Sequence, residues 1–151
     1  MKKFELTSDF VTFLGKKLFR IRALIEFGDV KAGELGGYIE KEENLDHDGN
    51  AWVCGDAQVY GDAQVYGDAQ VYGDARVCGD ADYAYAHGFG SEYRTTTFFR
   101  LKDGGVGVRC GCFYGTLQEF RDKVRETHGK TKKAREYLML ADLMELRFSK
   151  D

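Results

Sequence analysis

The sequence predicts a mainly β protein: a short left-handed triangular β-helix with an N-terminal β-hairpin, followed by a C-terminal β-hairpin plus two α-helices. Three observations predict this fold class. A six-residue word, Val-Tyr-Gly-Asp-Ala-Gln with small variations, repeats between Gly49 and Ala81, β-prone segments flank short turns on both sides of it, and helical periodicity follows only after them. We therefore divide the chain into an N-terminal hairpin cap (1–38), a hexapeptide β-helix (39–90) and a head of hairpin and helices (91–151).

The N-terminal segment has the pattern of a β-hairpin. Residues 11–14 and 18–25 are rich in β-branched and aromatic side chains, and Gly15-Lys16 between them suits a two-residue turn. A Gly-rich passage over residues 33–37 then leads into the repeat. We expect this hairpin to cover the first turn of the β-helix.

The hexapeptide word itself predicts one flat side and one corner. Within Ala-x-Val the Ala and Val side chains point to the same face, because successive strand residues alternate. The Gly-Asp that follows is turn chemistry, since Gly reaches positive φ freely and Asp tolerates left-handed conformations. Three words close a triangle of about 18 residues, so residues 18 apart, rather than six apart, should be neighbours.

The 18-residue period places outward-facing residues that are only six apart on different sides of the predicted triangle. Tyr60, Tyr66 and Tyr72 fall on three different sides, so we expect no stacked tyrosine ladder. Cys54 and Cys78 are also on different sides, which argues against a disulfide between them. The corner Asp residues are expected to bond to their own turns, although an acidic face that mimics DNA is an alternative.

The segment after residue 91 predicts a hairpin and two helices. Residues 95–101 and 106–114 are β-prone runs around a Lys-Asp-Gly-Gly turn. Thr116 and Glu119 have the capping-box spacing at the start of a first helix, and a second helix is predicted over about 131–148.

Composition limits the class of protein. The chain has 151 residues, 43% of them hydrophobic, with no stretch apolar enough to span a membrane and no apolar run near its start. We therefore expect no membrane association and a cytoplasmic location, with the four cysteines as thiols. The formal net charge of −3 argues against a nucleic-acid binder, because phosphate contacts need clustered Lys and Arg. The one basic run, residues 130–135, is interpreted as a solvated helix start.

A resemblance becomes visible in the segment IEFGDVKAGELGGYIEKEENL, residues 25–45, together with the hexapeptides that follow it. The chain resembles hexapeptide-repeat proteins of bacteria, phages and prophages, which are often labelled polymer-forming cytoskeletal-like. The runs TTTFF (95–99) and CGCFYG (110–115) resemble the ending of many phage members. The resemblance implies a left-handed β-helix, a mobile-element setting and, for a phage-encoded chain, the host cell cytoplasm. It implies no particular activity.

One group of head residues combines positive charge, hydroxyls and an aromatic ring. Arg side chains beside aromatic faces and Thr hydroxyls suit phosphate or nucleotide binding. The alternative is that the Arg residues only solvate the outer face of the hairpin. The candidate ligand- or partner-binding residues are Arg94, Thr95, Thr97, Phe99, Arg100 and Arg109.

A second group could hold a metal ion. Alternation along one strand puts Cys110 and Cys112 on the same face, and His128 could join them as a third ligand. The alternative is that the two Cys side chains pack as small apolar groups. We predict no metal and no cofactor, with these three residues as the weak metal candidates.

The sequence thus predicts a non-enzymatic scaffold and binding protein of phage or prophage type. We expect a homo-oligomer whose head binds a host macromolecule or sequesters a nucleotide ligand, as an anti-defence factor would. The alternative is an enzyme similar to hexapeptide acyltransferases, in which a His acts as base. Only His47, His87 and His128 could fill that role, and none has a visible partner that would orient it.

Overall fold

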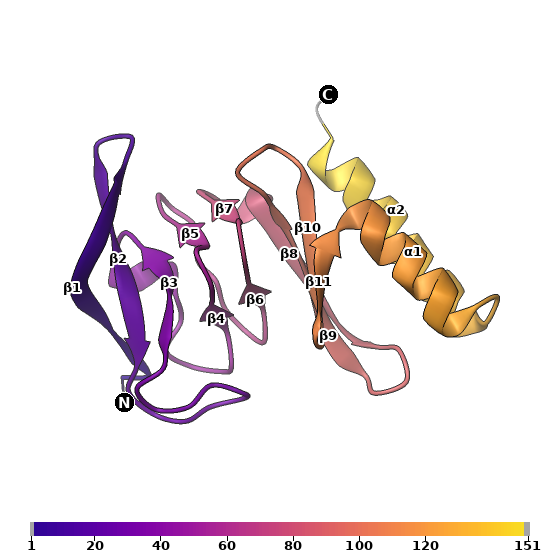
Figure 1. Ribbon diagram of the computed structural model, residues 1–151, viewed down its shortest axis with the longest axis horizontal. Coiled ribbons are helices and arrows are strands. Elements are labelled where there is room, and N and C mark those ends of the chain that lie inside the picture. Colours follow the sequence, from indigo (N-terminus) through magenta and orange to yellow (C-terminus); the bar gives the residue numbers. More distant parts are fainter. Residues whose placement is uncertain (1, 150–151) are drawn as a thin grey trace.

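A computed structural model describes residues 2–149 of the chain. The molecule is elongated, with an N-terminal hairpin at one end and two helices at the other (Figure 1). Between them lie the hexapeptide words, which we call the repeat segment (residues 49–81), and a four-stranded sheet. The repeat segment is therefore covered at both ends.

The predicted N-terminal hairpin is confirmed. Strands β1 (Phe4–Phe13) and β2 (Lys16–Ala23) pair antiparallel, and β2 also pairs antiparallel with β3 (Leu35–Ile39). The turn lies at Leu14-Gly15, one residue before the predicted position, and both residues have positive φ, 51° and 77°. Two consecutive positive φ values match the turn twist that two-residue hairpins favour.

The repeat segment forms four strands of only two residues each. They are β4 (Trp52–Val53), β5 (Gln58–Val59), β6 (Gln70–Val71) and β7 (Arg76–Val77). Trp52 pairs parallel with Gln70, and Gln58 with Arg76, so the prediction that residues 18 apart are neighbours is confirmed.

The predicted fold class, a mainly β protein built on a left-handed triangular β-helix, is wrong. The chain is 41% strand and 24% helix, arranged as three separate sheets and two helices. The repeat strands are divided between a five-stranded sheet of order β1-β2-β3-β5-β7 and a two-stranded sheet of β4 and β6. The physical reason is that two-residue strands pair little by themselves, so the antiparallel hairpin incorporates half of them into a mixed sheet.

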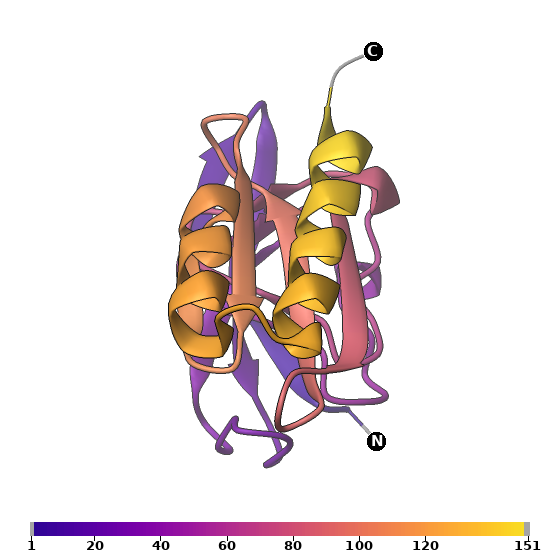
Figure 2. The same cartoon turned by 90° about the vertical axis from the view of Figure 1, so that its right-hand side faces the viewer.

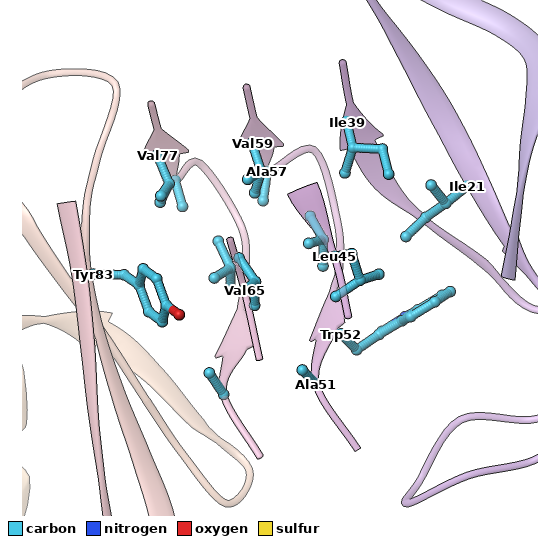
Figure 3. Close-up of a cluster of buried hydrophobic side chains, with 14 of the residues drawn as sticks. Ile21, Ile39, Leu45, Ala51, Trp52, Ala57, Val59, Val65, Val77 and Tyr83 are labelled. Atoms are coloured by element: carbon cyan, nitrogen blue, oxygen red, sulfur yellow. The ribbon is translucent and has the colours of Figure 1, made fainter. Parts of the chain in front are cut away.

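The Ala and Val side chains of the repeat form the main core. The Ala side chains at 51, 57, 63, 69 and 75 and the Val side chains at 53, 59, 65, 71 and 77 are at most 1% exposed. Figure 3 shows several of them pointing toward one another, with Ile21 from β2 and Trp52 closing one end and Tyr83 the other. The inward direction predicted for these positions is confirmed.

A four-stranded antiparallel sheet of order β11-β10-β9-β8 separates this core from a second one. Its strands are β8 (Tyr83–Phe89), β9 (Arg94–Arg100), β10 (Val106–Cys110) and β11 (Phe113–Thr116). From here on, the head means this sheet and the helices, so it begins with β8 rather than at residue 91. Phe99 joins the core of the repeat segment and its neighbour Phe98 joins the core under the helices, because adjacent strand residues face opposite sides.

Helices α1 (Leu117–His128) and α2 (Lys132–Phe148) lie side by side on the far face of the head sheet (Figure 2). The predicted capping box is confirmed, since the Thr116 hydroxyl accepts from the Glu119 N–H and the Glu119 carboxylate accepts from the Thr116 N–H. The predicted C-terminal hairpin is also confirmed, except that its second run divides into β10 and β11 at the turn Gly111-Cys112.

Hydroxyl groups of the head sheet satisfy backbone groups at the end of the repeat segment. The Tyr83 hydroxyl donates to the Gln64 carbonyl (2.5 Å), while Thr97 Oγ1 accepts from the Gln70 N–H (2.9 Å). The Tyr114 hydroxyl accepts from the Asp74 N–H (3.2 Å). These bonds cover strand edges that would otherwise be open to a second chain.

Candidate functional site

A cavity lies where the head sheet meets the repeat segment and the loop that precedes it. Its volume is about 280 Å³, and we call it the junction cavity. Its lining is mainly polar and comes from three parts of the chain. The lining residues are Gly28, Asp29, Asn50, Asp68, Gln70, His87, Arg94, Thr95, Arg109 and Gly111.

Strand register places the head residues of this cavity together. His87 on β8 pairs with Thr95 on β9, and their side chains are hydrogen-bonded, with Nδ1 and Oγ1 2.8 Å apart. On the next strand Arg109 pairs with Thr97, two residues along β9 from Thr95. Paired residues project to the same face of a sheet, so these side chains lie on the face that covers the repeat segment.

Arg109 is a cation without an anionic partner. Within residues 2–149 its side chain forms no ion pair and no hydrogen bond, and the Nε is a buried donor with no acceptor. Its guanidinium carbon lies 4.4 Å from the centre of the Tyr72 ring. Stacking on an aromatic face holds an arginine in place while it leaves the N–H donors free.

Arg94 is the second cation of the cavity, and it is paired. Its guanidinium contacts the Glu92 carboxylate, and the side chain lies against the backbone at Gly111, where a Cβ would collide with it. Gly111 has a φ of +59°, so both the space and the backbone conformation favour glycine there. A side chain at position 111 would displace Arg94.

The two walls of the junction cavity carry opposite charge. Arg94 and Arg109 belong to the head, while Asp29 and Asp68 belong to the N-terminal loop and the repeat segment. No ion pair joins either Asp to either Arg in the described chain. An anion would therefore be drawn to the head wall and repelled by the opposite wall.

The other predicted ligand residues lie elsewhere. Thr97 is 1% exposed and bonded to the repeat backbone, and Phe99 is fully buried in the core. Arg100 pairs with Asp82 through Nε (3.2 Å) and lies over the Phe148 ring. The structure therefore brings three of the six candidates, Arg94, Thr95 and Arg109, to one cavity.

The metal candidates share a second cavity of about 260 Å³, which we call the head cavity. The expectation that Cys110 and Cys112 lie on one strand face is wrong, because β10 ends at Cys110 and Cys112 is in the turn. Cys110 Sγ accepts from the Thr96 hydroxyl (3.2 Å), and His128 lies at the end of α1. Over residues 2–149 no three His, Cys, Asp or Glu side chains gather closely enough to hold a metal ion.

The head cavity itself has apolar walls and a polar rim. Phe113, Phe120, Val124 and Tyr137 supply the apolar surface. Polar groups stand around it on the β8–β9 loop, the turn after β10 and the end of α1. They are Ser91, Glu92, Arg94, Cys110, Cys112, Lys123, Thr127 and His128, and Arg94 is the residue that this cavity shares with the junction cavity.

Both ring nitrogens of His47 are hydrogen-bonded. Its Nδ1 accepts a hydrogen bond from the Lys3 N–H (3.0 Å), so Nε2 must carry the proton that it donates to Glu42 (2.8 Å). The hydrogen bond from His47 holds the pKa of the Glu42 carboxyl below its usual value. Both ring nitrogens are thus occupied, which leaves no lone pair for a general base.

Asn50, Asp68 and Gln70 line the junction cavity and Tyr72 stacks against Arg109, but none of the four was among the candidate ligand residues of the sequence analysis. Each occupies an ordinary position of the repeat segment, and no sequence signal tells which of its sides the head covers. Pairing in the predicted hairpin could have placed His87 only after β8 was known to join the same sheet.

Comparison of the chain with protein-family models gives no match, and comparison with curated proteins gives no significant match. The resemblance to hexapeptide-repeat phage proteins stays a prediction. Within residues 2–149, neither helix has the length and apolar character needed to cross a membrane.

Proposed function

We propose that this chain is a non-enzymatic binding protein whose junction cavity binds the phosphate group of an anionic ligand. The unpartnered guanidinium of Arg109 carries this proposal. A buried donor without an acceptor costs about 1–3 kcal/mol, and a ligand oxygen that accepts from it removes this cost.

The surroundings of Arg109 suit a phosphate. Arginine offers a planar fork of donors that matches phosphate oxygens, and Arg94 and Thr95 add further donors on the same wall. Asp29 and Asp68 repel an anion on the opposite wall and so orient it toward the head. The cavity supports capture of a ligand, and it does not supply the aligned nucleophile or base that a reaction would need.

Acyl transfer, the enzymatic alternative, has less support. His47 has no free ring nitrogen, and the Nδ1 of His87 is bonded to a Thr hydroxyl rather than to a carboxylate that could orient it as a base. Detectable binding of coenzyme A would be needed to revive this alternative.

The setting that we propose is a phage or prophage protein, in the host cytoplasm, that withholds a nucleotide from the host. Protein purified from host cells should then release a nucleotide on heat denaturation, as detected by chromatography of the supernatant. If the protein acts instead on a host macromolecule, a lysate pull-down should recover one partner and the supernatant should contain no nucleotide.

We also propose that the chain forms a homo-oligomer. Strand β1 is the outer strand of the five-stranded sheet, so the backbone groups along its free edge have no strand partner in the described chain. Light scattering of the purified protein should give a mass of at least two chains. A monomer mass at all concentrations would contradict this part of the proposal.

The central test compares Arg109→Gln with Arg135→Gln, which removes an exposed cation of α2 that does not line the cavity. We expect inorganic phosphate or pyrophosphate to bind the unaltered protein, and Arg109→Gln to weaken that binding at least tenfold, as loss of a charged hydrogen bond does. Isothermal titration calorimetry measures both. Absence of binding, or an equal loss in both variants, would overturn the proposal.

A further inference from the structure

The outer face of α2 carries a row of exposed apolar side chains. Met139, Leu143 and Leu146 are 70%, 53% and 71% exposed. Their spacing of four and then three residues places them on one line along the helix, and we call this row the α2 stripe. The buried side chains of α2 face the opposite way, toward the head sheet, so the stripe belongs to neither core.

The α2 stripe is open to solvent. The two helices form one end of the molecule, and in Figure 2 no other element of the described chain passes over α2. The neighbouring helix shows that this layer needs no apolar outer face, because the exposed positions of α1 carry polar side chains such as Asp122, Arg125 and Glu126. Contiguous apolar surface of this kind marks a contact with another molecule.

Charged residues flank the stripe in two pairs of opposite sign. Arg135 and Asp142, two helical turns apart, lie along one flank, and Glu136 and Arg147, three turns apart, lie along the other. On the first flank the positive charge is nearer the start of α2, and on the second flank the negative charge is nearer the start. Each flank therefore has opposite charges at its two ends.

A second copy of α2 that lies antiparallel across the stripe matches both flanks. A two-fold axis perpendicular to the two helices brings the same flank of both copies together. Arg135 then lies near the partner's Asp142, and Glu136 lies near the partner's Arg147. Antiparallel packing also places the positive end of each helix dipole beside the negative end of the other.

The four charged side chains are available for these contacts. Within residues 2–149, Arg135 and Glu136 form no ion pair, and the Arg147 side chain donates only to a backbone carbonyl (3.3 Å). Asp142 accepts from Arg121 through Oδ1 (2.9 Å), but its side chain is 75% exposed, so Oδ2 can accept from a second cation.

We infer that two copies of this chain associate through the α2 stripe, with the two helices antiparallel. The inference rests on the homo-oligomer of the proposed function and gives it a contact surface at the other end of the molecule from the free edge of β1 (Figure 1). Three apolar side chains on one helix bury less area than a permanent interface does, so the dimer should dissociate on dilution.

The test compares Leu143→Arg with Leu14→Arg by sedimentation velocity over a range of protein concentrations. Both leucines are exposed, so the fold should tolerate either change, and Leu14 lies in the turn between β1 and β2. We expect Leu143→Arg to raise the dissociation constant of the dimer at least tenfold, because it places a charge at the centre of the apolar contact. Leu14→Arg should behave like the unaltered protein.

Charge exchange tests the antiparallel arrangement. Glu136→Arg and Arg147→Glu each put like charges at both flank contacts between identical copies, so each variant alone should dimerise more weakly than the unaltered protein. An equal mixture of the two variants restores opposite charges at both contacts. We therefore expect a mixed dimer about as stable as the unaltered one.

The outcomes separate this inference from the proposed homo-oligomer. If the unaltered protein is monomeric at all concentrations, both fail. If it is dimeric and Leu143→Arg leaves the dissociation constant unchanged, only this inference is overturned, and loss of the dimer in Leu14→Arg alone would place the contact at the β1 end instead. Failure of the two charge variants to form a mixed dimer would overturn the antiparallel contact as well.

Discussion

Two cationic side chains show how differently the fold treats buried charge. Lys3 is 1% exposed, yet its ammonium donates to the carbonyl oxygens of Ala51 (2.7 Å) and Gly49 (3.4 Å) and lies over the Phe27 ring. Arg109 instead has a buried Nε with no acceptor. The first residue connects the N-terminus to the repeat segment. The second is the one we expect to meet a ligand.

The burial of Lys3 predicts a pH dependence of stability. Desolvation lowers the pKa of Lys3 from 10.5 to about 8 in the folded protein, partly opposed by Asp46 and Asp48. Between these two values the unfolded chain binds the proton more strongly, so the Lys3 contribution to the free energy of unfolding must rise with pH. Burial of the charged Lys3 therefore lowers the free energy of unfolding by its full amount below about pH 8, and this destabilisation disappears as the pH rises toward 10.5.

This contribution is isolated by comparison with Lys3→Met, measured by urea denaturation. From pH 7.5 to 9.5 the unaltered protein should gain about 1 to 2 kcal/mol relative to the variant. The comparison is needed because two cysteines lower the stability as the pH rises. Burial raises the thiol pKa of Cys54, and a hydrogen bond to Asp82 raises that of Cys78. A constant difference over this range would contradict the prediction.

At the scale of elements, glycines of the repeat let the head sheet approach its backbone. Gly73 has a φ of +65°, and a Cβ there would collide with the Tyr114 hydroxyl, which accepts from the N–H of the next residue, Asp74. Gly79 occupies the same place in its own word but has open space and no positive φ. Gly73 is thus required for the head sheet to pack on the repeat segment, whereas Gly79 is not.

We therefore predict that Gly73→Ala lowers the free energy of unfolding by about 1–3 kcal/mol, from backbone strain and displacement of Tyr114. Gly79→Ala is the control and should change stability by no more than about 0.5 kcal/mol. Both are measured by chemical denaturation. Equal effects of the two substitutions would show that the head does not rest on the repeat segment at Gly73.

At the scale of the whole molecule, the two cores share one sheet. Phe99 of β9 is buried in the core of the repeat segment and Phe98 in the core under the helices, and both are fully buried. A disturbance of β9 must reach both cores. The repeat segment and the head should therefore unfold together.

Two optical probes can test this coupling. Trp52 is the single tryptophan and lies in the repeat segment, so its fluorescence reports that part, while far-ultraviolet circular dichroism reports mainly α1 and α2. We expect coincident unfolding curves, and in Phe98→Ala a loss of about 3–5 kcal/mol seen equally by both probes. Separate midpoints would mean that the two parts unfold independently.

Local signals predicted much of the structure. The two hairpins, the capping box at Thr116 and Glu119 and the neighbours at 18 residues follow from turn residues, side-chain periodicity and the repeat itself. The predicted triangular β-helix was wrong because the period determines which hexapeptides lie next to each other but not which other strands pair with the edges of the repeat segment. From outside the repeat, β3 pairs with β5, and Thr97 of β9 accepts from the Gln70 N–H.

For the site, the sequence by itself determined the residue types: arginines, threonines and aromatic rings on alternating strand positions of the head. Only the tertiary structure decided which of them share a cavity. Alternation places Thr95 and Thr97 on the same face, but the burial of Thr97 against Gln70 and the partial exposure of Thr95 at the junction depend on how the sheet lies on the repeat segment. Periodicity describes neighbours along the chain. The Arg109 side chain instead packs against Tyr72, which is far from it in the sequence, and has no hydrogen-bond acceptor.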